Sequence, residues 1–277
     1  MSEEAPFGAF APVPAAQVWR RLAGRLPQGY LGRRLASLLL GPAGGRAGLP
    51  VDVDVFGSQK ARLHPFDNIC EKRVFIAPQL WDGAERALLA EAIGAHDDHF
   101  FWFADIGANV GLYTLFARAA AEQAGLRLRA LCVEADPEMR RRLAFNARAS
   151  AAEDDIRVFP FAAAGAEGRM RFAVDVASRG LSHLDPHGGL VVEARTILAI
   201  LAEAGAPRLD AMKIDIEGAE YAALEAFFRD APEALRPRLL ILETSHEAEG
   251  RSAKRLALDA GYRERLQTKR NFVGVRN

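Results

Sequence analysis

The feature that most constrains this sequence is an apolar run that leads into a glycine-spaced turn, over residues 100–116. Residues 100–104 are apolar without interruption, which is typical of a strand buried on both faces of a parallel sheet. Asp105, Gly107, Asn109 and Gly111 follow, and apolar residues then return at helical spacing. Strand, glycine turn and helix in this order form the first half of a doubly wound nucleotide-binding unit. We therefore expect a nucleotide-like cofactor at this turn, close to the backbone and to the free N–H groups of the helix.

The spacing of the turn indicates which cofactor it binds. A dinucleotide fingerprint reads G-x-G-x-x-G, whereas the turn from Asp105 to Gly111 reads D-x-G-x-N-x-G. The pattern resembles motif I of the class I methyltransferases that depend on S-adenosylmethionine (SAM), in which the acid at the strand end meets the amino-acid portion of SAM. The alternatives are an ordinary βα turn with two glycines and an NAD-type oxidoreductase, and the missing third glycine disfavours the oxidoreductase.

Length and composition bound the classes of protein that remain. A chain of 277 residues can form one large α/β domain with a modest extension. Lys plus Arg and Asp plus Glu number 36 each, so no overall charge favours nucleic acid as a partner. Cys70 and Cys132 do not make a disulfide framework. No apolar run has the length of a membrane span and the acidic start is unlike a signal peptide, so we expect a cytoplasmic enzyme.

Residues 1–64 are expected to form an extension to a domain over 65–277. Two basic amphipathic helices are predicted near residues 17–26 and 31–40, and alternation over 51–55 with a second run at 60–65 predicts a hairpin. Residues 17–40 could contact a membrane surface or a partner. The favoured interpretation is that they cap the core or a second subunit of a homo-oligomer. The polar cluster over 67–73 either lines a substrate cleft or is an ordinary surface loop.

A second strand, over residues 128–133, ends in an acid. A carboxylate at this position can accept hydrogen bonds from both hydroxyls of a ribose, which makes Glu134 a cofactor ligand. Asp136 is expected to cap the helix that begins at Pro137. A third strand over 156–164 should border the adenine, and the strand over 169–174 should pair back. The polar loop over 177–184 could hold substrate.

A second group of acids follows the predicted strand over residues 209–214. Asp215 and Glu217 come at its end, and Glu243 ends the next strand, with His246 just beyond it. Carboxylates would be costly inside a core unless they served a site. Asp215, Glu217 and Glu243 could instead gather Mg²⁺. Their spacing matches no diagnostic ligand pattern, and no metal site is assigned.

Four segments together resemble one family: 105–111, 133–137, 213–220 and 240–243 look like the FkbM family of SAM-dependent methyltransferases. The resemblance covers about residues 65–277. It implies an α/β fold with a Rossmann-like class I methyltransferase sheet, mostly parallel, with an antiparallel C-terminal hairpin. It also implies O-methylation of a small molecule, a sugar or glycan, or a secondary metabolite. A non-catalytic SAM-binding or scaffold protein is the alternative, and the acceptor itself is not identified.

The resemblance and the residue types together give each candidate a role. Methyl transfer to a hydroxyl needs a nucleophile aligned with the methyl group and a base for its proton, and His246 and Asp215 are the candidate bases. The expected SAM-binding residues are Asp105, Gly107, Asn109, Gly111, Glu134, Ala162 and Asp215. The expected acceptor-binding residues are Asn68, Arg73, Ser182, Glu217 and Glu243.

Overall fold

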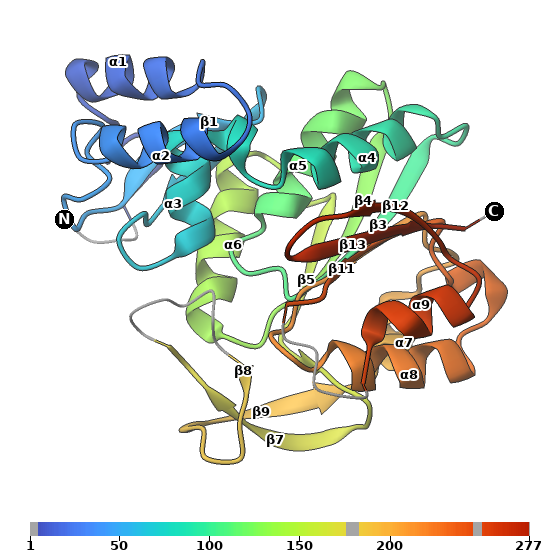
Figure 1. Cartoon of the computed structure of the whole chain (residues 1–277). Coiled ribbons are helices and arrows are strands. Elements are labelled where there is room, and N and C mark those ends of the chain that lie inside the picture. The colour runs from blue at the N-terminus through green and yellow to red at the C-terminus, as the bar shows by residue number, and fades with distance from the viewer. Residues whose placement is uncertain (1–4, 176–182, 246–250, 277) are drawn as a thin grey trace.

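The centre of the molecule is a seven-stranded sheet in the order β12-β13-β11-β10-β3-β4-β5 (Figure 1). A computed structural model describes residues 5–175, 183–245 and 251–276. Neighbouring strands from β11 to β5 run parallel, while β13 is antiparallel to both β11 and β12. The strands are β3 (Phe100–Ile106), β4 (Arg127–Val133), β5 (Ile156–Phe159), β10 (Ala211–Ile214), β11 (Leu239–Glu243), β12 (Arg263–Gln267) and β13 (Asn271–Val275). The expected sheet with its antiparallel hairpin is confirmed.

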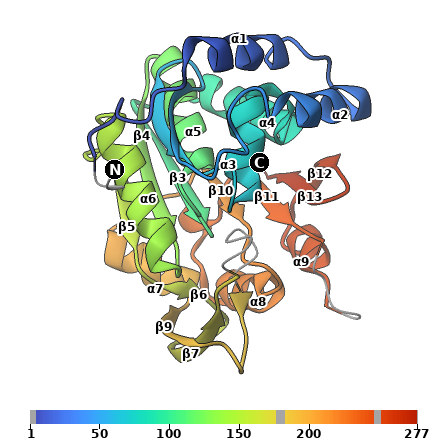
Figure 2. The same ribbon diagram turned by 90° about the vertical axis from the view of Figure 1, so that its left-hand side faces the viewer.

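Helices cover both faces of this sheet (Figures 1 and 2). Side chains alternate along a strand, so Phe101 and Phe103 pack with one group of helices and Ala104 and Ile106 with the other. The first group is α4 (Gly83–Gly94), α5 (Leu112–Gln123) and α6 (Pro137–Ala149). The second is α7 (Ile197–Ala204), α8 (Glu220–Asp230) and α9 (Ala253–Asp259). Two short 3₁₀ helices, η1 (Pro78–Leu80) and η3 (Glu233–Leu235), lie in connections. Asp136 caps α6 as expected, accepting from the N–H of Glu138.

The strand order creates a switch point between β3 and β10. The chain steps from β3 to β4 and β5 on one side, then returns to β10 on the other side of β3. The connections that leave β3 and β10 therefore diverge at the carboxyl edge of the sheet. Ligands of doubly wound folds bind in the crevice at such a point.

A second sheet differs from the sequence expectation. It has the order β6-β9-β7-β8, with β6 (Ala162–Ala163), β7 (Gly168–Ala173), β8 (His183–Leu184) and β9 (Leu190–Arg195). The single strand expected over 156–164 is wrong, because Pro160, which has no N–H to donate, separates β5 from β6. The strand β7 pairs with β9 and β8 and does not pair back onto β5. Phe172 and Val192 give this sheet a small core of its own.

The described part of the extension shares its core with the main sheet. It contains α1 (Pro14–Ala23), α2 (Tyr30–Leu39), β1 (Val51–Val55) and β2 (Gln59–Leu63), so the expected helices and hairpin are confirmed. The next helix, α3 (Ile69–Ile76), contains most of the polar cluster over 67–73, for which the sequence allows either a cleft wall or a surface loop. Because one apolar cluster joins the extension to β3 and β4, the division at residue 64 stays a prediction.

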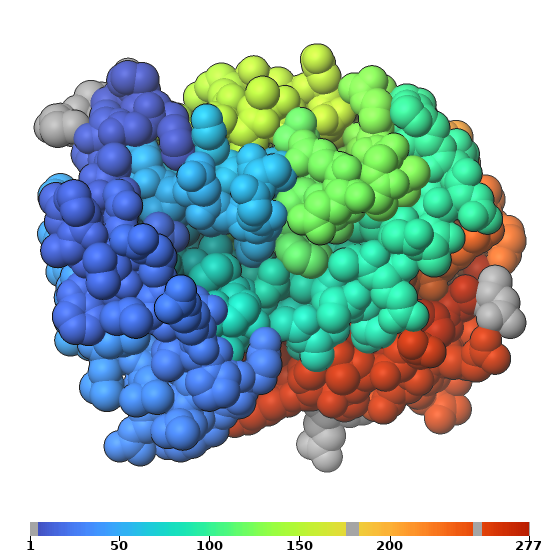
Figure 3. Space-filling view, turned by 90° about the horizontal axis from the view of Figure 1, so that it is seen from above, coloured from blue at the N-terminus to red at the C-terminus, as the bar shows by residue number. Residues whose placement is uncertain are grey.

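The two N-terminal helices bury their small side chains and expose their large ones. Ala16 and Ala23 of α1 and Gly32 and Ala36 of α2 are buried. The exposed side chains include Trp19, Leu22, Leu31, Leu35 and Leu38. Figure 3 shows this first part of the chain, in dark blue, along one side of the molecule. The helices do cap the core, but through small residues that allow close approach. Among the described residues, no helix has the length and apolarity that a bilayer crossing requires.

Candidate active site

A cleft opens at the carboxyl ends of β3, β4 and β10, at the switch point of the sheet. Helix α3, the segment 81–82 and Phe172 of β7 add further walls. Many of the residues expected from the sequence line it. From the expected SAM-binding set these are Gly107, Asn109, Glu134, Ala162 and Asp215. From the expected acceptor-binding set they are Arg73, Glu217 and Glu243.

The floor of the cleft is the turn after β3, and its shape depends on two left-handed residues. Gly107 has φ +76°, and a Cβ atom there would lie 1.8 Å from the carbonyl oxygen of Asp215. Asn109 has φ +51°, a conformation that asparagine tolerates better than most residues. The N–H groups of Gly107 and Ala108 donate to the carbonyl of Val133 at 2.9 and 3.0 Å. The turn is thus tied to the end of β4 and pressed against the segment after β10.

Glu134 presents a buried carboxylate to the cleft. Its Oε2 accepts from the N–H of Asn109 at 2.7 Å, and its Oε1 accepts from the N–H of Asp136 at 2.8 Å. Burial raises the pKa of this carboxyl to about 7, although the two backbone donors act in the opposite direction. Each carboxylate oxygen keeps a second lone pair. The geometry therefore leaves room for two hydroxyl donors on one acid.

Asp105 differs from its expected role, because it lies beneath the cleft and does not line it. The side chain is fully buried, and its Oδ2 accepts from the hydroxyl of Thr114 at 2.8 Å. Its Oδ1 lies 3.8 Å from Nζ of Lys213, with no hydrogen-bond partner among the described residues. Burial raises the pKa of Asp105 even though Lys213 opposes the shift. Asp105 therefore contacts the cleft indirectly, through Lys213, which lines it.

Lys213 is the central residue that the sequence analysis did not assign. Its Nζ lies 3.2 Å from Oδ2 of Asp215 and donates to the carbonyl of Gly107 at 3.1 Å. Burial alone would lower the pKa of this ammonium, but Asp215 and Asp105 outweigh burial and raise it. Lys213 therefore stays charged and fixes the Asp215 carboxylate, which is itself partly exposed in the cleft. The sequence feature that could have identified Lys213 as a site residue is a lysine inside an apolar strand, two residues before an acid.

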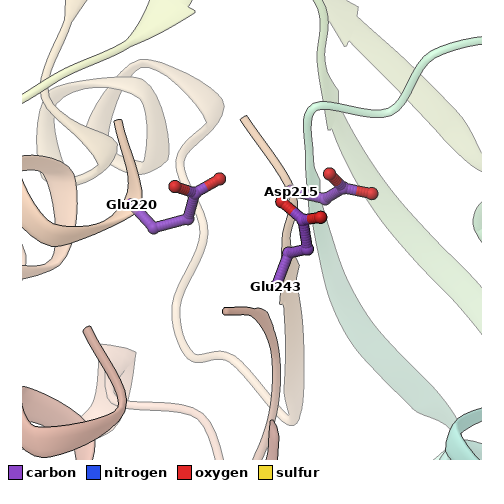
Figure 4. A group of neighbouring side chains, drawn as sticks. All are labelled: Asp215, Glu220 and Glu243. Carbon is purple, nitrogen blue, oxygen red and sulfur yellow. The ribbon is translucent and has the colours of Figure 1, made fainter. Parts of the chain in front are cut away.

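Three carboxylates, one of them that of Asp215, lie close together, but they are not the three that the sequence suggested. One oxygen each of Asp215, Glu220 and Glu243 lies within 4.8 Å of the others. Figure 4 shows the Asp215 and Glu243 carboxylates next to each other, with Glu220 opposite. Glu220 replaces the expected Glu217, and both of its oxygens already accept backbone N–H groups, from Ile216 and Gly218. Glu220 therefore braces the turn that opens α8, and no metal site is assigned.

Two other expected ligands support the site from outside the cleft. Asn68 is buried; its Oδ1 caps α3, and its Nδ2 donates to Oδ1 of Asn109 at 2.8 Å. It positions the turn and is not among the residues that line the cleft, and its role in acceptor binding stays a prediction. Gly111 begins α5 at φ +82°, where a Cβ would lie 3.0 Å from Cγ of Leu143, so it serves helix packing. Ser182 and His246 lie outside the described residues.

A tyrosine and an aspartate complete the wall that the sequence analysis left unassigned. The hydroxyl of Tyr113 donates to Oδ2 of Asp82 at 3.1 Å, and both side chains line the cleft. Burial raises the pKa of Asp82, and burial followed by the charge of Asp82 raises the pKa of Tyr113. Nothing local in the sequence pairs Asp82 with residue 113.

Comparison with known proteins identifies the family. The family model described as the methyltransferase FkbM domain matches residues 105–265, which is more than half of the chain. With a doubly wound sheet and a cleft at its switch point, the protein is of the Rossmann-like class. The chain belongs to the FkbM methyltransferase family. No curated protein matches it.

Solved structures give weaker similarities. Methyltransferase FkbM from Methylobacillus flagellatus KT is 18% identical with a TM-score of 0.46, over 95% of this chain and 58% of that chain. This chain thus spans little more than half of that protein. A SAM-dependent methyltransferase from Agrobacterium tumefaciens is 12% identical with a TM-score of 0.45, over 82% and 69% of the two chains. A precorrin-6y C5,15-methyltransferase from Geobacter metallireducens GS-15 is 14% identical with a TM-score of 0.41, over 69% and 87%.

Proposed function

We propose that this protein transfers a methyl group from SAM to a hydroxyl group of a small-molecule or glycan acceptor. The observation that carries the proposal is the charge and shape of the cleft beside Glu134. SAM carries a positive sulfonium, a positive ammonium and a negative carboxylate, so its net charge is positive, and among the described residues that line the cleft acids outnumber cations. The acids are Asp82, Glu134, Asp215, Glu217 and Glu243, and the cations are Arg73, Lys213 and Arg270.

The residues present fit SAM on three counts. Gly107 lines the cleft with backbone alone, which suits an amino-acid group. Glu134 has free lone pairs for ribose hydroxyls, and residues 161–163 offer an apolar wall for adenine. When bound, SAM supplies an electrophilic methyl group.

The chain's own residues then align the acceptor and take up its proton. Asp215, held by Lys213 at 3.2 Å, is one candidate base, and its carboxylate is partly open to the cleft. His246 is the other, since its unperturbed pKa is near neutral and it follows β11 by three residues. The apolar residues and Tyr113 around the cleft would exclude water from the acceptor hydroxyl.

SAM affinity should depend on pH through Glu134. Because only the ionised carboxylate accepts from both ribose hydroxyls, affinity should fall as the pH drops below about 7, by about tenfold per unit at the acid limit. Glu134→Gln should weaken binding by about 10- to 100-fold at pH 8 and remove most of this pH dependence. Calorimetric titration of SAM from pH 5.5 to 8.5 measures both. Glu153 is an exposed glutamate outside the cleft, and Glu153→Gln should bind SAM as the parent does. Equal SAM affinity in Glu134→Gln and the parent would contradict the assignment of Glu134 to the ribose.

The two candidate bases can be separated by turnover. If Asp215 accepts the proton, Asp215→Asn should lower kcat on the order of 10²-fold, whereas His246→Ala should leave kcat within about twofold. The reverse result assigns the base to His246. The measurement is the release of S-adenosylhomocysteine with an acceptor that supports turnover. Full activity in both variants would contradict a base at either position.

A further inference from the structure

A second cavity adjoins the cofactor cleft, and its charge has the opposite sign. We name it the basic cavity. It has a volume of about 640 Å³ and lies between α2, α3, the segment 80–85 and the turn that joins β12 to β13. A space of this size can take a small-molecule ligand. The cations on its wall are Arg33, Lys72, Arg73, Lys269 and Arg270, and the acids are Asp82 and Glu85. The described residues of this wall thus have a formal excess of three positive charges.

These five cations are not used by the fold. None of them forms an ion pair with any residue in the described ranges 5–175, 183–245 and 251–276. Arg142, which contacts the opposite side of α3, shows the contrast: it lies 2.7 Å from Asp67 and 3.1 Å from Glu71. Like charges gathered without partners repel one another, and a bound anion would relieve that repulsion.

The two acids on the wall have partners of their own. Oε1 of Glu85 accepts from the hydroxyl of Thr268 at 3.0 Å and from Nδ2 of Asn271 at 2.9 Å. Asp82 accepts from the hydroxyl of Tyr113 at 3.1 Å. Neither acid forms an ion pair with the five cations of the wall, so the positive charge of these cations is available to a ligand.

The basic cavity and the cofactor cleft share a boundary. The residues that line both are Ile69, Arg73, Trp81, Asp82, Arg270 and Asn271. One molecule could therefore occupy part of both spaces. Ile76 and Leu80 add apolar surface for a carbon skeleton.

We propose that the basic cavity binds a phosphate group of the methyl acceptor and directs a neighbouring hydroxyl of that acceptor into the cofactor cleft. This proposal rests on the proposed methyl transfer. Arginine presents a fork of N–H donors that matches phosphate oxygens, and lysine adds a point charge. The acidic cleft would then take the cationic donor and the basic cavity the anionic acceptor. Helix α2 of the extension supplies part of the wall, which gives the extension a role in acceptor choice.

The phosphate can belong to a water-soluble ester or to a lipid headgroup. The outer side of α2 exposes Leu31, Leu35 and Leu38, while its inner side lines the basic cavity. Residues 5–51 contain Arg20, Arg21, Arg25, Arg33, Arg34 and Arg46 and neither aspartate nor glutamate. An exposed apolar and cationic surface of this kind suits an anionic bilayer. Both sources therefore enter the test.

The test is calorimetric titration of inorganic phosphate at constant ionic strength. The parent protein should show saturable binding, and Lys72→Gln/Lys269→Gln should bind at least about tenfold more weakly. Lys72→Arg/Lys269→Arg keeps the charge and should retain binding, and Lys60→Gln, an exposed lysine on β2, should match the parent. No saturable binding to the parent, or equal affinity in the glutamine double variant, would overturn the proposal.

SAM titration of the same preparations separates this proposal from the proposed function. SAM binding without phosphate binding removes only the acceptor proposal, and phosphate binding without SAM binding removes only the methyl-donor assignment. Co-sedimentation with phosphatidylcholine vesicles, with and without phosphatidic acid, distinguishes the sources. Retention by phosphatidic acid that the glutamine double variant loses assigns the phosphate to a lipid. Phosphate binding without such retention assigns it to a soluble ester.

Discussion

Replacing Lys213 with methionine should lower the free energy of unfolding by about 3–5 kcal/mol, the usual cost of removing one partner from a buried charge cluster. Lys213 is buried between Asp105 and Asp215, and it also donates to the carbonyl of Gly107. Methionine fills a similar volume but leaves the fully buried Asp105 without its counter-charge. Urea denaturation at pH 7 measures the loss.

The pH dependence of the stability of Lys213→Met, and a second substitution at Asp105, test whether the loss comes from the contact between these two residues. Without Lys213 the pKa of Asp105, already raised by burial, should rise further. A carboxyl group whose pKa is higher in the folded than in the unfolded protein stabilises the fold at low pH, and this stabilisation is lost as the pH rises. The stability of Lys213→Met should therefore fall further below that of the parent from about pH 4 upward. Asp105→Asn in the Lys213→Met background should restore part of the stability. A loss below about 1 kcal/mol, independent of pH, would contradict the cluster's role.

Local patterns in the sequence predict the parts of the site that form within one stretch of chain. The turn from Asp105 to Gly111 and the acid at Glu134 follow strands that are recognisable from apolar runs, and strand ends are where ligands bind. Asp215 and Glu243 were found by the same argument. Of the residues predicted in this way, Gly107, Asn109, Glu134, Asp215 and Glu243 line the cleft, whereas Asp105 and Gly111 do not.

The rest depends on pairings between distant segments. Lys213 is opposite Asp105 only because β10 pairs with β3 in that register, which no local pattern reveals. Glu220 approaches Asp215 because its carboxylate folds back on the turn before α8. Sequence spacing instead favoured Glu217, which has φ +53° in that turn.

The basic cavity is still harder to predict from the sequence. Its cations come from α2, α3 and the β12–β13 turn, segments separated by most of the chain. In the sequence, Arg33 belonged to an amphipathic helix and Lys269 to a hairpin turn. Only the complete fold, which places α2 and the turn of the C-terminal hairpin on the wall of one cavity, brings their side chains together.

Gly107→Ala should be the most damaging change that adds a single methyl group. Its Cβ would lie 1.8 Å from the carbonyl oxygen of Asp215, and the residue would keep a left-handed φ of +76°. The φ strain and the forced displacement together should cost about 2 to 5 kcal/mol of stability. The displacement would separate the turn after β3 from the segment after β10, so SAM binding should fall below detection by calorimetry.

Gly125→Ala is the matched control for this substitution. Gly125 has φ +73°, but a Cβ atom there meets nothing within 4 Å. The strain of a left-handed φ should therefore lower the free energy of unfolding of Gly125→Ala by only about 1 to 2 kcal/mol. This variant should keep the SAM affinity of the parent. The difference between the two variants isolates the contact between Gly107 and Asp215. If Gly107→Ala resembled Gly125→Ala in both stability and SAM binding, the close approach of these two loops would not be what shapes the cofactor cleft.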